Sequence, residues 1–146
     1  MAIREVIAAQ IFEQGRWLME MHYNEAGFYF EFNPSLELYQ TMEQAGLLHC
    51  LAAFDGDEMI GYCSFFMSRH LFNRDLVAAS SDALYVHPDY RNRPIAGKLI
   101  AKSEQYAKEH GANVFVWHTR AGTALSNVLL KRPEYEAWDM CIARRF

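Results

Sequence analysis

Two segments near the start of the chain carry apolar residues at the three- and four-residue spacing of an amphipathic helix. The first runs from about Ala8 to Asn24 and is followed by Gly27, a residue type that commonly ends helices. The second begins after Asn33-Pro34, which offer a capping side chain and a proline at the first turn, and it ends at Gly46. The pattern therefore predicts two consecutive helices.

The middle of the chain changes to apolar runs with the length of strands. Leu47–Phe54 and Met59–Met67 are separated by Asp55–Glu58, whose Asp-Gly-Asp-Glu composition is typical of a turn between antiparallel strands. Asp75–Val86 predicts a third strand, which stops at His87–Asp89 because the proline there disfavours either regular structure. We therefore expect an antiparallel meander.

The last third predicts helices that alternate with strands. Pro94–His110 has a long amphipathic pattern and is followed by Val114–Trp117, a short buried-strand signal. Thr123–Arg132 predicts a further helix, stopped by Pro133, and Tyr135–Arg145 predicts one or two terminal strands. With Ile3–Val6 as a first strand, the chain is expected to form an α+β fold. Its mixed, mostly antiparallel sheet would have six or seven strands, flanked by about four helices.

Composition favours a single globular domain and argues against a nucleic-acid-binding, membrane-spanning or metal-binding protein. The chain has 146 residues, of which 51% are apolar, so one domain spanning residues 1–146 is expected. A net charge of −4 argues against a nucleic-acid surface, and no apolar run reaches the length of a membrane span. Cys50, Cys63 and Cys141 are widely spaced and the start of the chain lacks a signal-peptide pattern, which predicts a reduced, cytoplasmic protein. The histidines show no metal-ligand spacing, so no metal site is expected.

The segment Leu84–Ile100 reads LYVHPDYRNRPIAGKLI and joins a predicted strand to the long helix. It resembles the acetyl-CoA-binding signature of the GNAT superfamily of N-acetyltransferases, a loop of the form Arg/Gln-x-x-Gly-x-Gly/Ala. Arg91, Pro94 and Ala96 stand at the three defined positions. The resemblance covers roughly Leu47–Phe146. It implies a GNAT-like fold, acetyl-CoA as cosubstrate and an amine of a small molecule or protein as acceptor.

Such a loop suits the coenzyme because free backbone N–H groups and the positive end of a helix converge on its pyrophosphate. Pro94 departs from the pattern, since proline has no N–H to donate. The resemblance implies the following coenzyme-binding residues: Leu84, Tyr85, Val86, Arg91, Asn92, Arg93, Pro94, Ile95, Ala96, Gly97, Lys98, Thr123 and Ser126.

Two residues are candidates for proton transfer from the acceptor amine. Asp82 precedes Val86 by four residues, which simple alternation places on the same strand face, and many family members carry an acidic residue there. The alternative is a solvent-facing carboxylate or one paired with an arginine. His118 follows the short strand, where the central strands are expected to part, although a lone histidine is more often structural.

Leu130 stands where the family usually has a tyrosine that protonates the departing thiolate. This leaves three hypotheses: an active N-acetyltransferase, a catalytically silent coenzyme-binding or partner-binding module of the same fold, and a structural or partner-binding α+β protein with no coenzyme site. The polar run His22–Glu25 and the aromatic residues of Phe28–Phe32 either shape the acceptor pocket or serve as a helix terminus and core packing. Trp138–Phe146 could form the strand edge of a homodimer, and the chain's ending also resembles acetyltransferase-like proteins of tailed phages.

Overall fold

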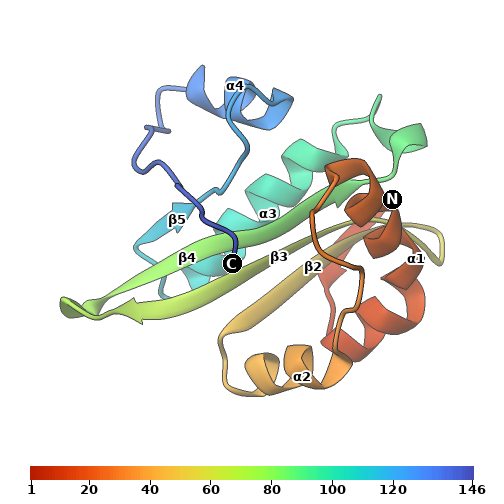
Figure 1. The fold of residues 1–146 in the computed structure, drawn as a ribbon, viewed down its shortest axis with the longest axis horizontal. Coiled ribbons are helices and arrows are strands. Elements are labelled where there is room, and N and C mark those ends of the chain that lie inside the picture. The colour runs from red at the N-terminus through yellow and green to blue at the C-terminus, as the bar shows by residue number, and fades with distance from the viewer.

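A computed structural model describes residues 1–146, and its elements keep the predicted order as far as the last helix (Figure 1). The elements are β1 (Ala2–Glu5), α1 (Ala8–Ala26), α2 (Leu36–Gln44), β2 (Leu48–Asp55), β3 (Glu58–His70), β4 (Asn73–Val86), the short 3-10 helix η1 (Pro88–Tyr90), α3 (Ile95–Glu109), β5 (Val114–Val116) and α4 (Ala124–Leu130).

The ends of the first two helices have local causes. Ile7 at the start of α1 offers no capping side chain, and the Glu43 carboxylate from α2 accepts the Ala8 N–H at 2.6 Å instead. α1 ends at Gly27, whose φ of 63° is the left-handed conformation that glycine favours. α2 is capped by Ser35 rather than by the predicted Asn33, because the Ser35 hydroxyl lies next to the free N–H of the first turn. No helix combines the length and apolar composition needed to cross a membrane.

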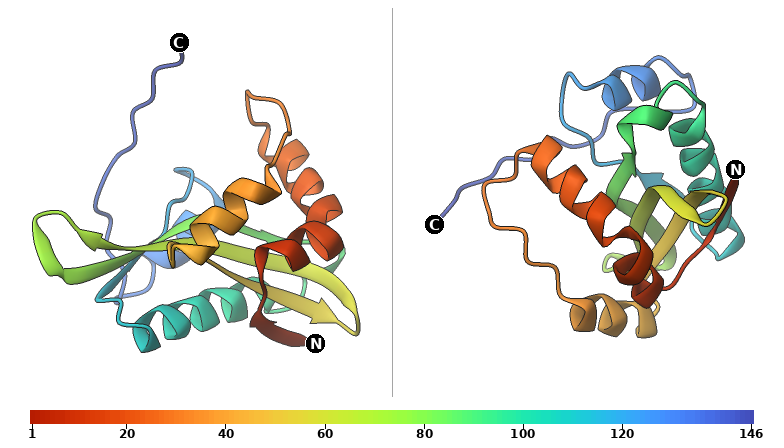
Figure 2. Two further views of the ribbon diagram at one scale, coloured as in Figure 1. Left: turned by 90° about the horizontal axis from the view of Figure 1, so that it is seen from below. Right: turned by 90° about the vertical axis from the view of Figure 1, so that its right-hand side faces the viewer.

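The sheet has five strands in the order β1-β2-β3-β4-β5, so the prediction of six or seven strands is wrong. All neighbours are antiparallel except β4 and β5, which are parallel. The missing strands are those expected within Tyr135–Arg145, which has no regular structure. A strand needs a hydrogen-bonded neighbour, and the three-residue β5 offers a short edge that the tail does not follow (Figure 2).

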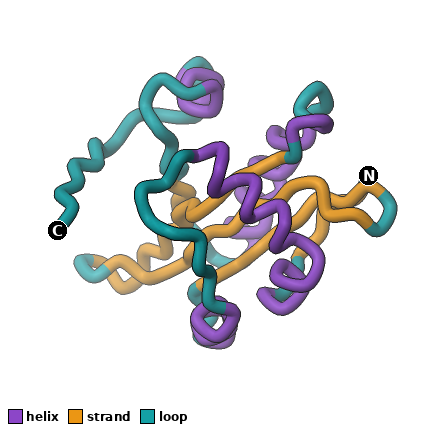
Figure 3. Tube along the Cα trace, turned by 45° about the vertical axis from the view of Figure 1, so that its right-hand side comes forward, coloured by secondary structure: helices purple, strands orange, loops and turns teal.

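Helices cover both faces of the sheet (Figure 2). α1 and α2 lie on one face and α3 on the other, and Figure 3 shows α1 running across the strands. Each face has its own apolar core, because alternate strand residues point to opposite sides. Leu18, Phe54 and Met59 belong to the core under α1, whereas Phe65 and Leu99 belong to the core under α3. The sheet thus separates two layers of helices, each with its own core.

Candidate functional site

β4 and β5 pair at one end only. Their register joins Ala78–Ser80 to Val114–Val116, after which β5 ends while β4 continues to Val86. The His87 N–H donates to the Ile60 carbonyl at 2.8 Å, and this bond fixes the alternation of backbone groups along the end of β4. Tyr85 accordingly turns its N–H and carbonyl toward β3. The backbone groups of Leu84 and Val86 point to the opposite side, which no strand covers.

The start of α3 lies directly after this strand end and carries unpaired backbone donors. The N–H groups of Ala96 and Gly97 have no acceptor in the protein, and the first turn contains no acidic side chain. A Cβ added at Gly97 would meet nothing within 4 Å, so the space above it is open. Lys98 is exposed and makes no ion pair. This end of a fifteen-residue helix therefore fits an anionic ligand.

The two predicted phosphate-binding arginines are engaged within the protein. The Arg91 guanidinium donates to the Val86 carbonyl at 2.9 Å and pairs with both carboxylate oxygens of Glu25. Arg93 lies 3.6 Å from Asp55 and over the ring of Tyr90. Among the groups of this loop, the backbone N–H of Asn92 also has no acceptor. Free donors for a phosphate thus come from backbone and Lys98 more than from the arginine side chains.

Asp82 occupies a β-bulge in β4. Ser64 faces Ala83 and Phe65 faces Ser81, which leaves Asp82 as the extra residue. The expectation that Asp82 shares a face with Val86 is therefore wrong, because the bulge shifts the alternation. Asp82 lies on the α1 and α2 face, where the Ser64 hydroxyl donates to Oδ2 at 2.9 Å. Its carboxylate forms no ion pair and its other oxygen has no protein partner.

A group of polar side chains continues from Asp82 along the same face. The Tyr62 hydroxyl and His22 Nδ1 are 2.7 Å apart, and the His22 ring stacks on Tyr85 at 4.7 Å. Burial lowers the pKa of His22, although the nearby charges of Glu25 and Asp82 oppose this shift. At neutral pH the imidazole is therefore uncharged, between two carboxylates.

The sequence left His22–Glu25 open between a role in the acceptor pocket and a helix terminus, and it gave no such role to Tyr62 and Ser64. His22 and Glu25 are three residues apart on α1, a spacing that places them on one side of a helix, and this signal was available in the sequence. Tyr62 and Ser64 lie in an apolar strand and carry no signal of function, because they alternate like core residues.

His118 lies two residues beyond β5 and bridges the point where the central strands part. Its backbone N–H donates to the Ser81 hydroxyl and its Nε2 lies 2.8 Å from the Ser80 hydroxyl. Thr123 and Ser126 use their hydroxyl groups at the start of α4, where Thr123 accepts the Ser126 N–H and donates to the Arg120 carbonyl. The predicted roles of these three residues stay predictions.

Aromatic side chains lie in the loop that follows α1. Phe28, Tyr29 and Phe30 are exposed, whereas Phe32 is partly buried and packs against the core under α1, so core packing holds for Phe32 alone. Arg120, from the loop after β5, donates to the Ala26 carbonyl at 2.6 Å and stacks over Phe28. The end of α1 and the segment after β5 are thereby tied together beside the polar group.

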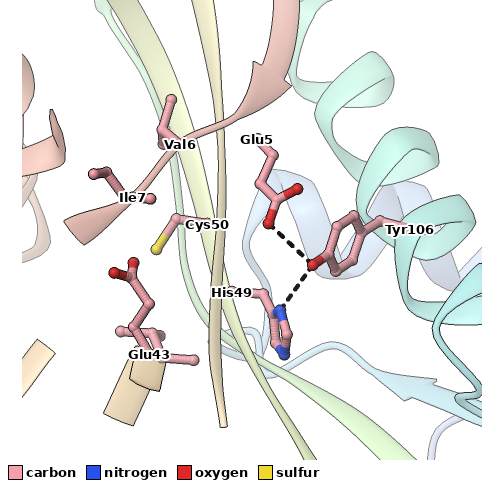
Figure 4. A pocket seen from close by; sticks show the side chains of 8 residues that line it. Glu5, Val6, Ile7, Glu43, His49, Cys50 and Tyr106 are labelled. Carbon is pink, nitrogen blue, oxygen red and sulfur yellow. Dashed lines mark hydrogen bonds between the residues drawn. The ribbon is translucent and has the colours of Figure 1, made fainter. Parts of the chain in front are cut away.

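A cavity of about 140 Å³ lies elsewhere, lined by residues of β1, α2, β2 and α3 (Figure 4). The Tyr106 hydroxyl there connects Glu5 and His49, and the Cys50 thiol lies nearby. Burial raises the pKa of Cys50 to about 12, so this thiol is protonated and unsuited to nucleophilic attack. The contacts of this cavity join structural elements rather than form a reaction site.

The sequence profile of the Acetyltransferase (GNAT) family matches residues 15–130, so the chain belongs to this family. A search of curated proteins finds no significant match. Solved structures share the fold over nearly the whole chain. An aminoglycoside acetyltransferase from an uncultured soil metagenomic sample, in complex with sisomicin, has a TM-score of 0.77 at 14% identity, covering 99% of this chain and 94% of that one.

Two further structures extend the comparison. A ribosomal-protein-alanine N-acetyltransferase from Brucella melitensis biovar Abortus 2308 has a TM-score of 0.73 at 20% identity, covering 99% of this chain and 100% of that one. An aminoglycoside N-acetyltransferase, AAC(6′)-Iy, in complex with CoA, has a TM-score of 0.73 at 18% identity, covering 99% and 98%. At these identities the likeness shows the fold alone. A phage origin stays a prediction.

Proposed function

We propose that this protein is an N-acetyltransferase that moves an acetyl group from acetyl-CoA to an amine. The observation that carries the proposal is the end of β4, where the Leu84 backbone groups and the Val86 N–H point away from β3 without a protein partner. The unpaired N–H groups of Ala96 and Gly97 follow in the next element. Such a row suits an elongated ligand with amide carbonyls along its arm and phosphates at its end. Asp82 lies on the other side of the same strand end. Membership of the family supports this assignment.

In this reaction, Val86 and Asp82 would each assist a different part of the acetyl transfer. The coenzyme supplies an acetyl thioester, and the Val86 N–H is placed to donate to an oxygen that becomes negative during attack. The amine forms the new C–N bond as the C–S bond breaks. Asp82 takes the first proton of the ammonium, at the oxygen without a protein partner, so that the amine attacks in its neutral form. The second proton that the nitrogen loses as the amide forms passes to the departing sulfur, directly or through water, and the free thiol leaves.

The acceptor is expected to carry a cationic amine. Asp82 places a carboxylate without an ion pair on the α1 and α2 face, and Phe30 adds an exposed ring of the kind that suits an ammonium group. Among the proteins with a similar fold, one is an aminoglycoside acetyltransferase in complex with sisomicin and another is a ribosomal-protein-alanine N-acetyltransferase. A small polyamine-like molecule and a protein amine are both consistent with this face.

Calorimetry with acetyl-CoA tests the proposal against the alternative of a module without a coenzyme site. Coenzyme at a hundred times its dissociation constant should stabilise the fold by about 2.7 kcal/mol, which raises the melting temperature by roughly 5–10 °C. Lys98→Glu should weaken binding several-fold, whereas Lys108→Glu makes the same charge change at the far end of α3 and should not. An unchanged melting temperature and no heat of binding would refute the assignment.

A further inference from the structure

His22 and Asp82 are each held by a side chain of β3. The His22 ring lies against the Tyr62 hydroxyl, and the Asp82 carboxylate accepts a hydrogen bond from the Ser64 hydroxyl. Tyr62 and Ser64 are two residues apart in a regular stretch of β3, so both side chains point to the α1 and α2 face, about 6–7 Å apart along the strand. The imidazole and the carboxylate are therefore neighbours on this face.

The Tyr62 hydroxyl decides which nitrogen of His22 carries the ring hydrogen. It lies 2.7 Å from Nδ1, and the structure gives this buried hydroxyl no other hydrogen-bond partner. Burial raises the pKa of Tyr62, so the phenol keeps its proton and needs an acceptor for it. Tyr62 therefore donates to Nδ1. Because burial also keeps the imidazole neutral, its one ring hydrogen is on Nε2.

The Nε2–H of His22 is a donor without a partner in the protein. Ser103 Oγ is the one buried side-chain nitrogen or oxygen that lacks a hydrogen bond, so the unpaired Nε2 is not buried. The ring is held in place, because it stacks on Tyr85 at 4.7 Å and lies edge-on to Phe28. His22 thus offers a fixed donor near an Asp82 oxygen that also has no protein partner. A neutral donor does not repel a cationic amine bound to that oxygen.

Resting on the proposed function, we propose that His22 is a specificity residue, which selects an amine that carries a hydroxyl or carbonyl oxygen on the neighbouring carbon. The amine binds at Asp82, and its oxygen accepts from His22 Nε2–H. Tyr62 is the positioning residue that keeps the hydrogen on Nε2. An amino sugar and the N-terminus of a peptide both contain such a pair of groups, whereas a plain alkylamine or polyamine has no oxygen to accept this hydrogen bond.

The relative rates of two matched amines test this role. The amine trans-2-aminocyclohexanol carries the oxygen and cyclohexylamine lacks it, and the quantity compared is the ratio of their kcat/KM values with acetyl-CoA. In the double variant His22→Phe with Tyr62→Phe, this ratio should fall roughly 3- to 30-fold, because the donor is lost while both rings remain. Changing both residues leaves no buried hydroxyl without an acceptor. His70→Phe, the same change at the exposed end of β3, should leave the ratio as in wild type.

A second pair of amines distinguishes the two sources of this chemistry. Alanine amide has the amine and carbonyl of a peptide N-terminus, and sec-butylamine is its oxygen-free counterpart. A fall of the first ratio alone indicates an amino alcohol as the acceptor, and a fall of the second ratio alone indicates a peptide. A loss of activity from a disturbed fold lowers the rates of both amines in a pair and leaves their ratio unchanged.

Nitrogen NMR of His22 gives a measurement that does not depend on turnover. At neutral pH the wild-type spectrum should show the ring hydrogen on Nε2, and the signal is assigned by its absence from His22→Phe. Tyr62→Phe should show the hydrogen shared between Nδ1 and Nε2, because the hydroxyl that fixes it has gone.

Three results would overturn the proposal. The first is a double variant whose ratios equal those of wild type for both pairs of amines. The second is a wild-type His22 with its hydrogen on Nδ1, which makes Nε2 an acceptor. The third is a wild-type protein that acetylates other amines but neither of the two that carry an oxygen. If no amine of any kind is acetylated, the proposed function fails as well, whereas these three results leave it intact.

Discussion

Asp82 combines a fixed position with a free oxygen, which suits proton uptake from a bound amine. Ser64 holds one carboxylate oxygen, and the bulge turns the side chain toward the polar face under α1. Asp82→Asn keeps the shape and removes the basicity. We expect turnover to fall by roughly 10² to 10⁴ while acetyl-CoA affinity is kept. Asp75→Asn, at the exposed far end of β4, is the matched control. Full turnover of the Asp82 variant between about pH 6 and 9 would make Asp82 structural.

Leu130 stands where the family usually has a tyrosine that protonates the departing thiolate. It is half-exposed at the end of α4 and cannot donate a proton, yet a thiolate is a tolerable leaving group near neutral pH. We therefore predict slow but measurable transfer, and a higher turnover for Leu130→Tyr. The comparison needs one confirmed acceptor and the melting temperatures of both proteins. A folded variant that binds acetyl-CoA normally and gains no turnover would show that another group already supplies the proton.

The Glu25–Arg91 pair should also appear in the pH dependence of stability. The hydrogen bond from Arg91 holds the pKa of Glu25 below its ordinary value, so the stabilisation is present above about pH 4.5 and is lost as the pH falls through the lowered pKa. The Arg91 and Glu25 side chains are 43% and 48% exposed, which limits the effect to about 1 kcal/mol or less.

Melting curves from neutral to acidic pH check this prediction. The difference between wild type and Glu25→Gln should be present at pH 7 and should vanish at low pH, because both side chains are then neutral. A difference that stays constant across this range would mean that the carboxylate charge contributes nothing.

At the scale of elements, Gly97 lowers the stability of α3 and leaves the backbone at the start of this helix open to a ligand. Glycine within a helix costs about 0.5–1 kcal/mol relative to alanine, and nothing in the protein would obstruct a Cβ at Gly97. Gly97→Ala should therefore raise the free energy of unfolding by about this amount and weaken acetyl-CoA binding. Chemical denaturation and calorimetry measure the two effects. A variant that is more stable and binds with unchanged affinity would place the phosphates away from Gly97.

Most helices and strands could be predicted from the sequence, but a strand irregularity and the long-range contacts could not. The helices, the hairpin at Asp55–Glu58 and the strand-loop-helix segment that ends in α3 follow from periodicity and turn residues, and the structure has them. The bulge at Asp82 could not be predicted, because an extra residue in a strand leaves no mark in composition. The contacts of Arg91 with Glu25 join residues 66 positions apart, which no local pattern reveals. The candidate residues were identifiable, but their partners were not.

At the scale of the whole molecule, the C-terminal tail exposes large apolar side chains that a monomer leaves in water. Trp138, Met140 and Ile142 alternate along the tail and are 59%, 84% and 90% exposed. We expect this segment to add as a strand to the sheet of a second copy, at β5, which is one of the two edge strands. Light scattering should then report a dimer for the full chain and a monomer after removal of Trp138–Phe146. A monomeric full chain would contradict this expectation.

The central claim is that the end of β4 and the start of α3 form an acetyl-transfer site with Asp82 as the base. The most direct measurement is mass spectrometry of a panel of amines, including aminoglycosides, polyamines and peptides with a free N-terminus, after incubation with the protein and acetyl-CoA. We predict that at least one acceptor gains an acetyl group, with an equal amount of free thiol released, and that Asp82→Asn loses most of this transfer. Binding of acetyl-CoA with no acetylated amine, or transfer that Asp82→Asn leaves intact, would contradict the account.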